Sequence, residues 1–184
     1  MCTIDEGLLA KIAAGDKEAF ESLYRLTASA VYGYTLSILK NTHDAEDAMH
    51  ETFVSVYKGA ASYVRQGKPM AWILTIARNA AYMKLKGRRR LTSAGSADEV
   101  LSISQAETER DDRDGFAQYE DRELLTAAMK LLDESERQII VLHAVAGVKH
   151  REIAELMETP ISTVLSKYKR ALEKLRKYLE EEEL

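Results

Sequence analysis

The stretch HREIAELMETPISTVLSKYKRALEKL, residues 150–175, decides the fold of the carboxyl-terminal part of the chain. It contains two helical patterns, His150 to Met157 and Pro160 onward, joined by a turn of about two or three residues. Pro160 suits a first helical turn, where its missing N–H has no partner to lose, and Thr159 before it suits an N-cap. The spacing predicts a helix-turn-helix.

The second of these helices has an apolar face and a polar face. Apolar side chains recur at three- and four-residue intervals and predict a buried stripe of Val164, Tyr168, Ala171, Leu172 and Leu175. The outward face then carries Ser162, Thr163, Ser166, Lys167, Lys169 and Arg170. Hydroxyl and cationic groups on the first turns of a helix suit base edges and phosphates in a major groove. A merely solvated basic face is the alternative, and periodicity leaves both interpretations open. Lys174, further along, is expected to be solvated.

The composition of the whole chain favours helices. The 184 residues are 46% apolar, with only 2 prolines and 9 glycines, and runs of β-favouring residues are scarce. The formal net charge of -4 excludes a uniformly basic nucleic-acid coat, so any DNA binding must depend on local clusters. We therefore expect an all-α protein.

Few residues suit catalysis or metal binding. Cys2 is the only cysteine, which excludes an intramolecular disulfide and a thiolate-rich metal cage. The four histidines do not have the spacing of a metal-binding pair, and no glycine-rich phosphate loop is found. We expect no catalytic residue, no metal and no cofactor. Because no run of ~18 apolar residues occurs, we also expect a cytoplasmic protein without membrane insertion.

The helical patterns fall into two groups. The first group covers residues 5–14 and 16–39, then restarts at Asp44 and again at Pro69, with Asp16 and Asp44 as expected N-caps and Gly15 as a helix stop. From Leu91 to about Tyr119, Ser, Gly, Ala and acidic residues replace the pattern, which predicts a flexible acidic linker. Four further helices are expected at about 120–131, 134–146, 149–157 and 160–179. We predict two small helical domains, residues 1–91 and 120–184, joined by a linker over 92–119.

Residues 131–175, LLDESERQIIVLHAVAGVKHREIAELMETPISTVLSKYKRALEKL, resemble region 4 of the bacterial sigma factors of RNA polymerase. The segments DAEDAMHETFVSVYK (residues 44–58) and AWILTIARNAAYMKLKGRRR (residues 71–90) resemble sigma region 2, in the same order. Together they cover nearly the whole chain except the linker. The chain is therefore similar to the two-domain extracytoplasmic-function (ECF) sigma factors. A stand-alone helix-turn-helix regulator is the alternative, but that interpretation gives the amino-terminal segments no function.

The resemblance implies three binding surfaces. Residues on the exposed face of the helix after Asp44 would contact the core polymerase: Asp47, His50 and Glu51. The loop from Tyr63 to Lys68 would receive a flipped base of the minus-10 promoter element, beside a DNA-facing surface of Arg78, Asn79, Lys84, Lys86, Arg88, Arg89 and Arg90. The second domain would read the minus-35 element through Ser162, Thr163, Ser166, Lys167 and Arg170. Trp72 is expected in the core rather than as a stacking platform.

Some positions depart from the family pattern, which often has a basic residue where Leu165 stands, a hydroxyl cap at Lys149 and glycine at Glu158. We expect weaker capping of the helix after Lys149 and a shifted DNA preference. The resemblance also implies that the acidic linker passes through the polymerase, although an inert spacer is the alternative. The implied partners are core RNA polymerase, promoter DNA and an anti-sigma factor.

Overall fold

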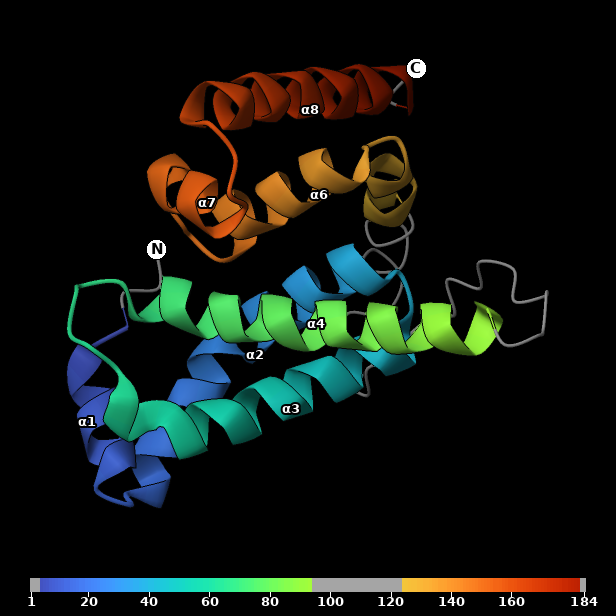
Figure 1. Ribbon diagram of the computed structural model, residues 1–184. Helices are drawn as coiled ribbons and strands as arrows, with labels where there is room; N and C mark the ends of the chain where they lie inside the picture. Colours follow the sequence, from blue (N-terminus) through green and yellow to red (C-terminus); the bar gives the residue numbers. More distant parts are fainter. Residues whose placement is uncertain (1–3, 94–123, 183–184) are drawn as a thin grey trace, which may run out of the picture.

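The computed structural model describes residues 4–93 and 124–182, and every regular element in these ranges is helical (Figure 1). Residues 124–130 are also helical. The all-α prediction is confirmed. The labelled elements are α1 (Glu6–Ala13), α2 (Lys17–Leu39), α3 (Thr42–Gly59), a 3-10 turn η1 (Ala60–Ser62), α4 (Pro69–Ser93), α6 (Glu134–Ile140), its π-helical continuation η2 (Val141–Val145), α7 (His150–Leu156) and α8 (Ile161–Glu182).

The first half of the chain is a bundle in which α2, α3 and α4 pack against one another and α1 closes one end. The predicted inner face of α3 is confirmed, since its buried residues are Ala45, Ala48, Met49, Thr52, Phe53 and Val56. From α4, Ile73 and Leu74 are completely buried, as are Leu23 and Val31 of α2. Each such side chain contributes roughly 1.5–3 kcal/mol through its removal from water. This packing gives the bundle a rigid surface for the loop before α4.

Short polar side chains cap the first turns of α1, α2, α3 and α6. Asp16 caps α2 as predicted, because its carboxylate accepts a hydrogen bond from the Ala19 amide at 3.0 Å. The prediction that Asp44 caps α3 is wrong. Asn41 holds that position and accepts from the Asp44 amide at 2.9 Å, which leaves Asp44 in the first turn of the helix.

The second half stacks α8 on a layer formed by α6 and α7 (Figure 1). Asp133 and Glu136 form a capping box at the start of α6, each accepting a hydrogen bond from the other's amide. On α8, Val164 and Ala171 are fully buried as predicted, but Leu172 is 44% exposed. The prediction that Leu172 is buried is wrong, because the neighbouring Ala171 is the residue that α8 buries there, in a cluster with Leu132 and Ile140.

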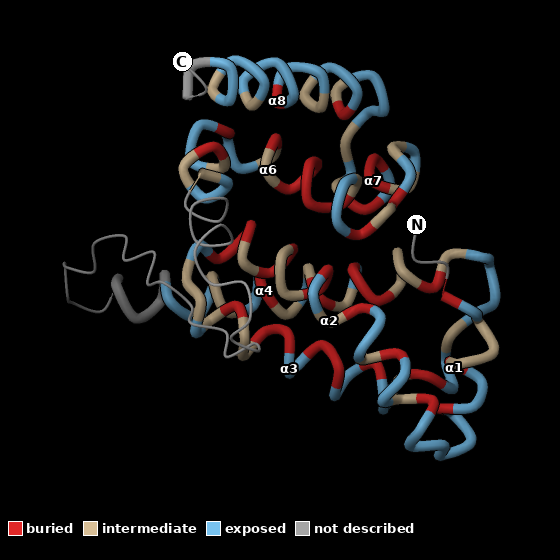
Figure 2. The backbone as a smooth tube through the Cα atoms, turned by 180° about the vertical axis from the view of Figure 1, so that it is seen from behind, coloured by how far each residue is buried: buried red, intermediate tan, exposed pale blue. Residues whose placement is uncertain are grey.

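The two halves are packed together. Helix α2 contacts α6 and η2, and α4 contacts α7, so buried residues continue from one half into the other (Figure 2). Gly33 of α2 permits a close approach, since a Cβ there would lie 3.4 Å from Cγ1 of Val141. Residues 94–123, which contain most of the predicted linker, lie outside the described residues. Helix α4 continues to Ser93, slightly beyond the predicted domain boundary.

Candidate nucleic-acid and polymerase interface

The predicted polymerase-binding acids lie on the exposed side of α3, where a lysine of α4 meets them. Lys84 Nζ is 3.2 Å from Asp47 Oδ2 and 3.3 Å from Glu51 Oε1. Its hydrogen bond holds the pKa of Asp47 below the usual range. Burial opposes the charge on Lys84, but the two carboxylates outweigh burial and raise the lysine pKa. Lys84, predicted as a phosphate contact, is therefore held against the acids predicted to bind polymerase.

The remaining charges of this region are more accessible. His50 is exposed one turn from Asp47, and Lys86 is exposed on α4. Arg88 pairs with Asp44 at 2.9 Å, which connects the basic half of α4 to the first turn of α3. The predictions for Arg89 and Arg90 concern side chains outside the described ones.

A glutamate from α1 organises the loop before α4. The Tyr63 hydroxyl donates to Glu6 Oε1 at 2.5 Å, and the Gly67 amide donates to the same oxygen at 2.7 Å. These bonds lower the pKa of the Glu6 carboxyl, with the tyrosine bond the largest cause. Sequence analysis missed Glu6, because a contact between residues so far apart in the chain leaves no local pattern.

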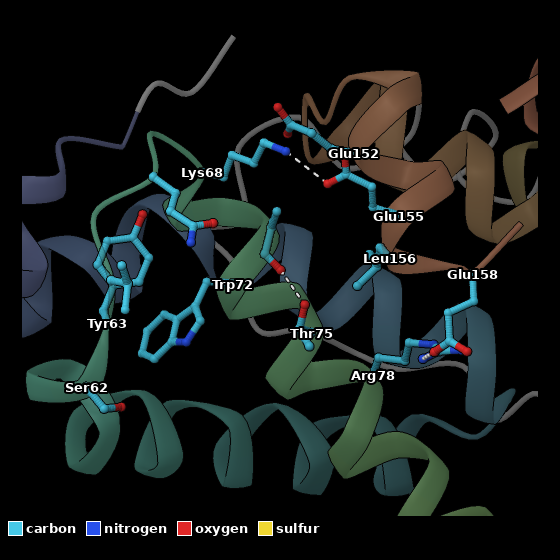
Figure 3. Close-up of a pocket in the computed structure, with 13 residues that line it drawn as sticks. Ser62, Tyr63, Lys68, Trp72, Thr75, Arg78, Glu152, Glu155, Leu156 and Glu158 are labelled. Carbon is cyan, nitrogen blue, oxygen red and sulfur yellow. Dashed lines mark hydrogen bonds and ion pairs between the residues drawn. The ribbon is translucent and has the colours of Figure 1, made fainter. Parts of the chain in front are cut away.

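A pocket of about 490 Å³ opens between this loop, α4 and the α7 region (Figure 3). Tyr63, Lys68, Trp72 and Arg78 line the side formed by the first half of the chain. Trp72 is half-buried: it packs against the core and stands with its ring 5.2 Å from that of Tyr63. The expectation that Trp72 is a core residue is therefore correct for only part of its ring, since the rest lines the pocket.

Glutamates from the second half of the chain form the opposite wall of the pocket. Lys68 Nζ lies 2.9 Å from Glu155 Oε2, and Arg78 Nη1 lies 3.0 Å from Glu158 Oε1. The hydrogen bond to Glu155 is the main cause of a raised pKa at Lys68. Asn79, next to Arg78, is exposed. Three residues predicted to contact the minus-10 element, Tyr63, Lys68 and Arg78, thus line one pocket, and Lys68 and Arg78 each already hold a carboxylate.

The outward face of α8 agrees with the prediction at Ser162, Ser166 and Arg170, which are exposed, while Thr163 is half-buried. The prediction that Lys167 faces outward needs a correction. Lys167 is half-buried and turns back toward α6, where its ammonium donates to the Ser135 hydroxyl and lies 4.0 Å from Asp133 Oδ2. The reason is electrostatic, because the carboxylate that caps α6 attracts it.

Lys174 also needs a correction, because it is not simply solvated. Its Nζ lies 2.6 Å from Oε2 of Glu136, whose side chain is only 1% exposed. The same carboxylate oxygen accepts from the Asp133 amide at 3.0 Å. Two lysines of α8 are therefore anchors on the start of α6, and the helix that carries Ser162 and Arg170 is positioned by them.

Comparison with known proteins finds a family match for each half of the chain. Sigma-70 region 2 matches residues 23–91, and Sigma-70 region 4 matches residues 122–175. The chain belongs to the sigma-70 family. It is an RNA polymerase sigma factor of the ECF type, and the match to region 2 disfavours a stand-alone helix-turn-helix regulator. Sigma factors initiate transcription without being enzymes, so this sigma factor is not an enzyme either.

Several curated relatives span almost the whole sigma factor. The ECF RNA polymerase sigma factor SigK of Mycobacterium ulcerans (strain Agy99) is 28% identical over 178 residues, covering 94% of this chain and 92% of the relative. SigK of Mycobacterium tuberculosis (strain ATCC 25618 / H37Rv) is 29% identical over 178 residues, covering 95% and 93%. The shared length includes both domains.

Solved structures with the same fold include two complexes. RpoE from Bartonella quintana, crystallised with the anti-sigma factor NepR, has a TM-score of 0.70 and 21% identity, covering 88% of this chain and 96% of that one. CnrH, in complex with the cytosolic domain of CnrY, has a TM-score of 0.62 and 21% identity, covering 96% and 97%. Within residues 4–93 and 124–182, no helix is long and apolar enough to cross a membrane.

Proposed function

We propose that this sigma factor binds core RNA polymerase through the exposed face of α3 and reads a promoter through two separate surfaces. The first is the loop from Tyr63 to Lys68 with α4, for the minus-10 element. The second is the first half of α8, for the minus-35 element. The observation that carries the proposal is the grouping of Tyr63, Lys68, Trp72 and Arg78 around one pocket.

The minus-10 surface has the chemistry needed to hold an opened strand. Unpairing a base costs a few kcal/mol, which stacking on an aromatic ring and a fitting pocket offset. The pocket offers the rings of Tyr63 and Trp72, and the cations of Lys68 and Arg78 stand at its edge for phosphates. Exposed Asn79 and Lys86 extend this surface along α4.

The minus-35 surface is the exposed face of α8. Ser162 and Ser166 offer hydroxyl groups and Arg170 offers a guanidinium, which suit base edges and backbone phosphates in a major groove. Thr163, half-buried, lies beside them. Lys167 contributes mainly by fixing the helix on α6, as its contacts with Ser135 and Asp133 indicate.

The polymerase-binding surface consists of Asp47, His50 and Glu51. Lys84 keeps the two carboxylates close together, so a basic surface of the polymerase would meet a preformed acidic pair. An anti-sigma factor is a further proposed partner, because RpoE, which has a similar fold, was crystallised with the anti-sigma factor NepR. We place the activity in the cytoplasm, with the polymerase.

In vitro transcription tests the proposal. Core polymerase with the wild-type chain should initiate at promoters identified from transcript start sites after overexpression. The Asp47→Ala/Glu51→Ala variant should bind core polymerase more weakly, and Arg170→Ala should bind core normally but lose promoter selectivity. Glu21→Ala, in an exposed ion pair with Arg25 at the far end of α2, is the control and should do neither. Unchanged core affinity of the α3 variant would contradict the assigned polymerase surface.

A further inference from the structure

Three glutamates of the second domain lie against the proposed minus-10 surface of the first: Glu152, Glu155 and Glu158. They line the pocket opposite Tyr63 and Trp72 (Figure 3). We call these three residues the acidic clasp. Resting on the function proposed above, we propose that the acidic clasp occupies the minus-10 surface in the isolated sigma factor and must be displaced before a DNA strand enters.

The clasp places oxyanions where a nucleic acid would place its own. Glu155 Oε2 is 2.9 Å from Lys68 Nζ, and Glu158 Oε1 is 3.0 Å from Arg78 Nη1. Charge-assisted hydrogen bonds of this length are also those that lysine and arginine make with phosphate oxygens. A cation that holds a carboxylate in this way cannot hold a phosphate with the same N–H group. Strand binding and clasp contact therefore compete for the charge and for one N–H group of each cation.

The backbone at Glu158 indicates that its side chain has a specific role. Helix α7 ends in a Schellman motif: the Thr159 amide donates to the Ala154 carbonyl at 3.0 Å, and the Glu158 amide donates to the Glu155 carbonyl at 3.2 Å. This motif requires a left-handed residue at Glu158, and its φ is 53°. Glycine adopts that conformation without steric cost, whereas a residue with a Cβ is disfavoured. The ion pair with Arg78 is a gain that glycine could not supply.

An apolar contact holds the clasp in place. Beside the ion pairs, buried Leu156 lines the same pocket, and α2 packs closely on η2 at Gly33 and Val141. The clasp glutamates themselves are mostly accessible, since the side chains of Glu155 and Glu158 are 59% and 77% exposed. Ion pairs this exposed are individually weak, so the clasp is suited to reversible opening.

Trp72 provides an internal probe for the open state. It is the only tryptophan of the chain and lines the pocket between the two domains. Opening the clasp would expose its ring to solvent. Acrylamide quenching of its fluorescence therefore measures opening without a label and without knowledge of the promoter sequence.

The test compares the full-length wild-type chain with the Glu155→Gln/Glu158→Gly variant. Loss of two exposed ion pairs should shift the closed-to-open equilibrium by roughly 2- to 30-fold. We expect a larger Trp72 quenching constant and a similar gain in affinity for a random-sequence single-stranded DNA pool, measured by fluorescence anisotropy. The variant should fold normally, because glycine fits the left-handed position, and a circular dichroism melt checks this.

A matched control removes the same charge elsewhere. Glu21→Gln/Glu180→Gln breaks two exposed glutamate–arginine pairs, with Arg25 and Arg176, whose residues do not line the pocket. It should quench and bind DNA like the wild type. An equal gain in the control would overturn the proposal, because net charge alone would explain it. Unchanged quenching and affinity in the clasp variant would overturn it as well.

Failure of the clasp can be told apart from failure of the proposed function. If core polymerase with the wild-type chain initiates transcription while the clasp variant behaves like the wild type, the proposed function stands and the clasp is wrong. If the variant opens and binds DNA more tightly but no polymerase complex initiates, the clasp stands and the proposed function is wrong.

Discussion

Replacing Lys174 with methionine is expected to destabilise the second domain, because it would leave the carboxylate of Glu136 buried without its cation. That carboxylate is 1% exposed and would retain the hydrogen bond from the Asp133 amide at 3.0 Å. A buried polar group that loses a partner costs about 1–3 kcal/mol. Breaking a fully buried ion pair costs more, but the Lys174 side chain is 44% exposed, so we expect the lower range.

Urea denaturation followed by circular dichroism measures this effect as a lower unfolding midpoint. Glu136→Gln keeps an acceptor for the Asp133 amide and removes the charge. In the Glu136→Gln background, Lys174→Met should therefore cost less than about 0.5 kcal/mol. Lys169→Met is the matched control, because Lys169 lies on the same helix and its ion pair among the described residues is an exposed one, with Glu173 at 3.9 Å.

The reasoning would be refuted if Lys174→Met and Lys169→Met had the same midpoint, or if Lys174→Met were equally destabilising in the wild-type and Glu136→Gln backgrounds. In either case the buried carboxylate would not depend on Lys174. A confirmed coupling would also predict weaker minus-35 recognition by Lys174→Met, since α8 would lose one of its two lysine anchors on the start of α6.

Three other predictions concern the DNA-reading surfaces and the effect of pH. Arg170→Ala should weaken binding to minus-35 duplex DNA, with a lower salt dependence, whereas Arg176→Ala further along α8 should bind normally in the same titration. Glu6→Ala should lower the affinity of the polymerase complex for the minus-10 strand by about 2- to 10-fold, because the loop loses the hydrogen bonds that fix Tyr63 and the Gly67 amide. Equal affinity of the variant and the wild type would contradict a positioning role for Glu6. Burial, and then the neighbouring His143, lower the pKa of His150 from 6.5, and its Nε2 is buried without a partner among the described residues. Thermal stability should therefore fall as pH decreases below about 6.5, because the unfolded chain binds a proton that the folded one resists. The fall should be less steep in His150→Gln.

The helices and much of their packing were predictable from local patterns. The buried face of α3 follows directly from three- and four-residue spacing, and Asp16 with Gly15 marks the start of α2. Errors occurred where two residues suit one role, as Asn41 and Asp44 do for the cap of α3, and where the predicted buried stripe was too wide, as at Leu172. There the outcome depends on where the helix starts or on how closely a second helix approaches, and neither is encoded in spacing.

The sequence predicted several residues of the candidate site but not the contacts that hold them in place. The sequence identified the loop from Tyr63 to Lys68 and Arg78 through resemblance to sigma region 2. It did not indicate that Glu6 fixes this loop, or that Lys84 lies between Asp47 and Glu51. Each of these contacts joins residues far apart in the chain, so the spacing of residues within one helix cannot predict them.

The sequence alone determined that this protein is helical, has two domains and carries the motifs of a sigma factor, because helix periodicity, capping residues and short motifs are local properties. Only the tertiary structure decided how the charges are shared. Lys167 and Lys174 stabilise the start of α6, while Glu155 and Glu158 meet Lys68 and Arg78 across the domain boundary. The physical reason is that the partner of a charge is chosen by distance and burial after the chain has folded.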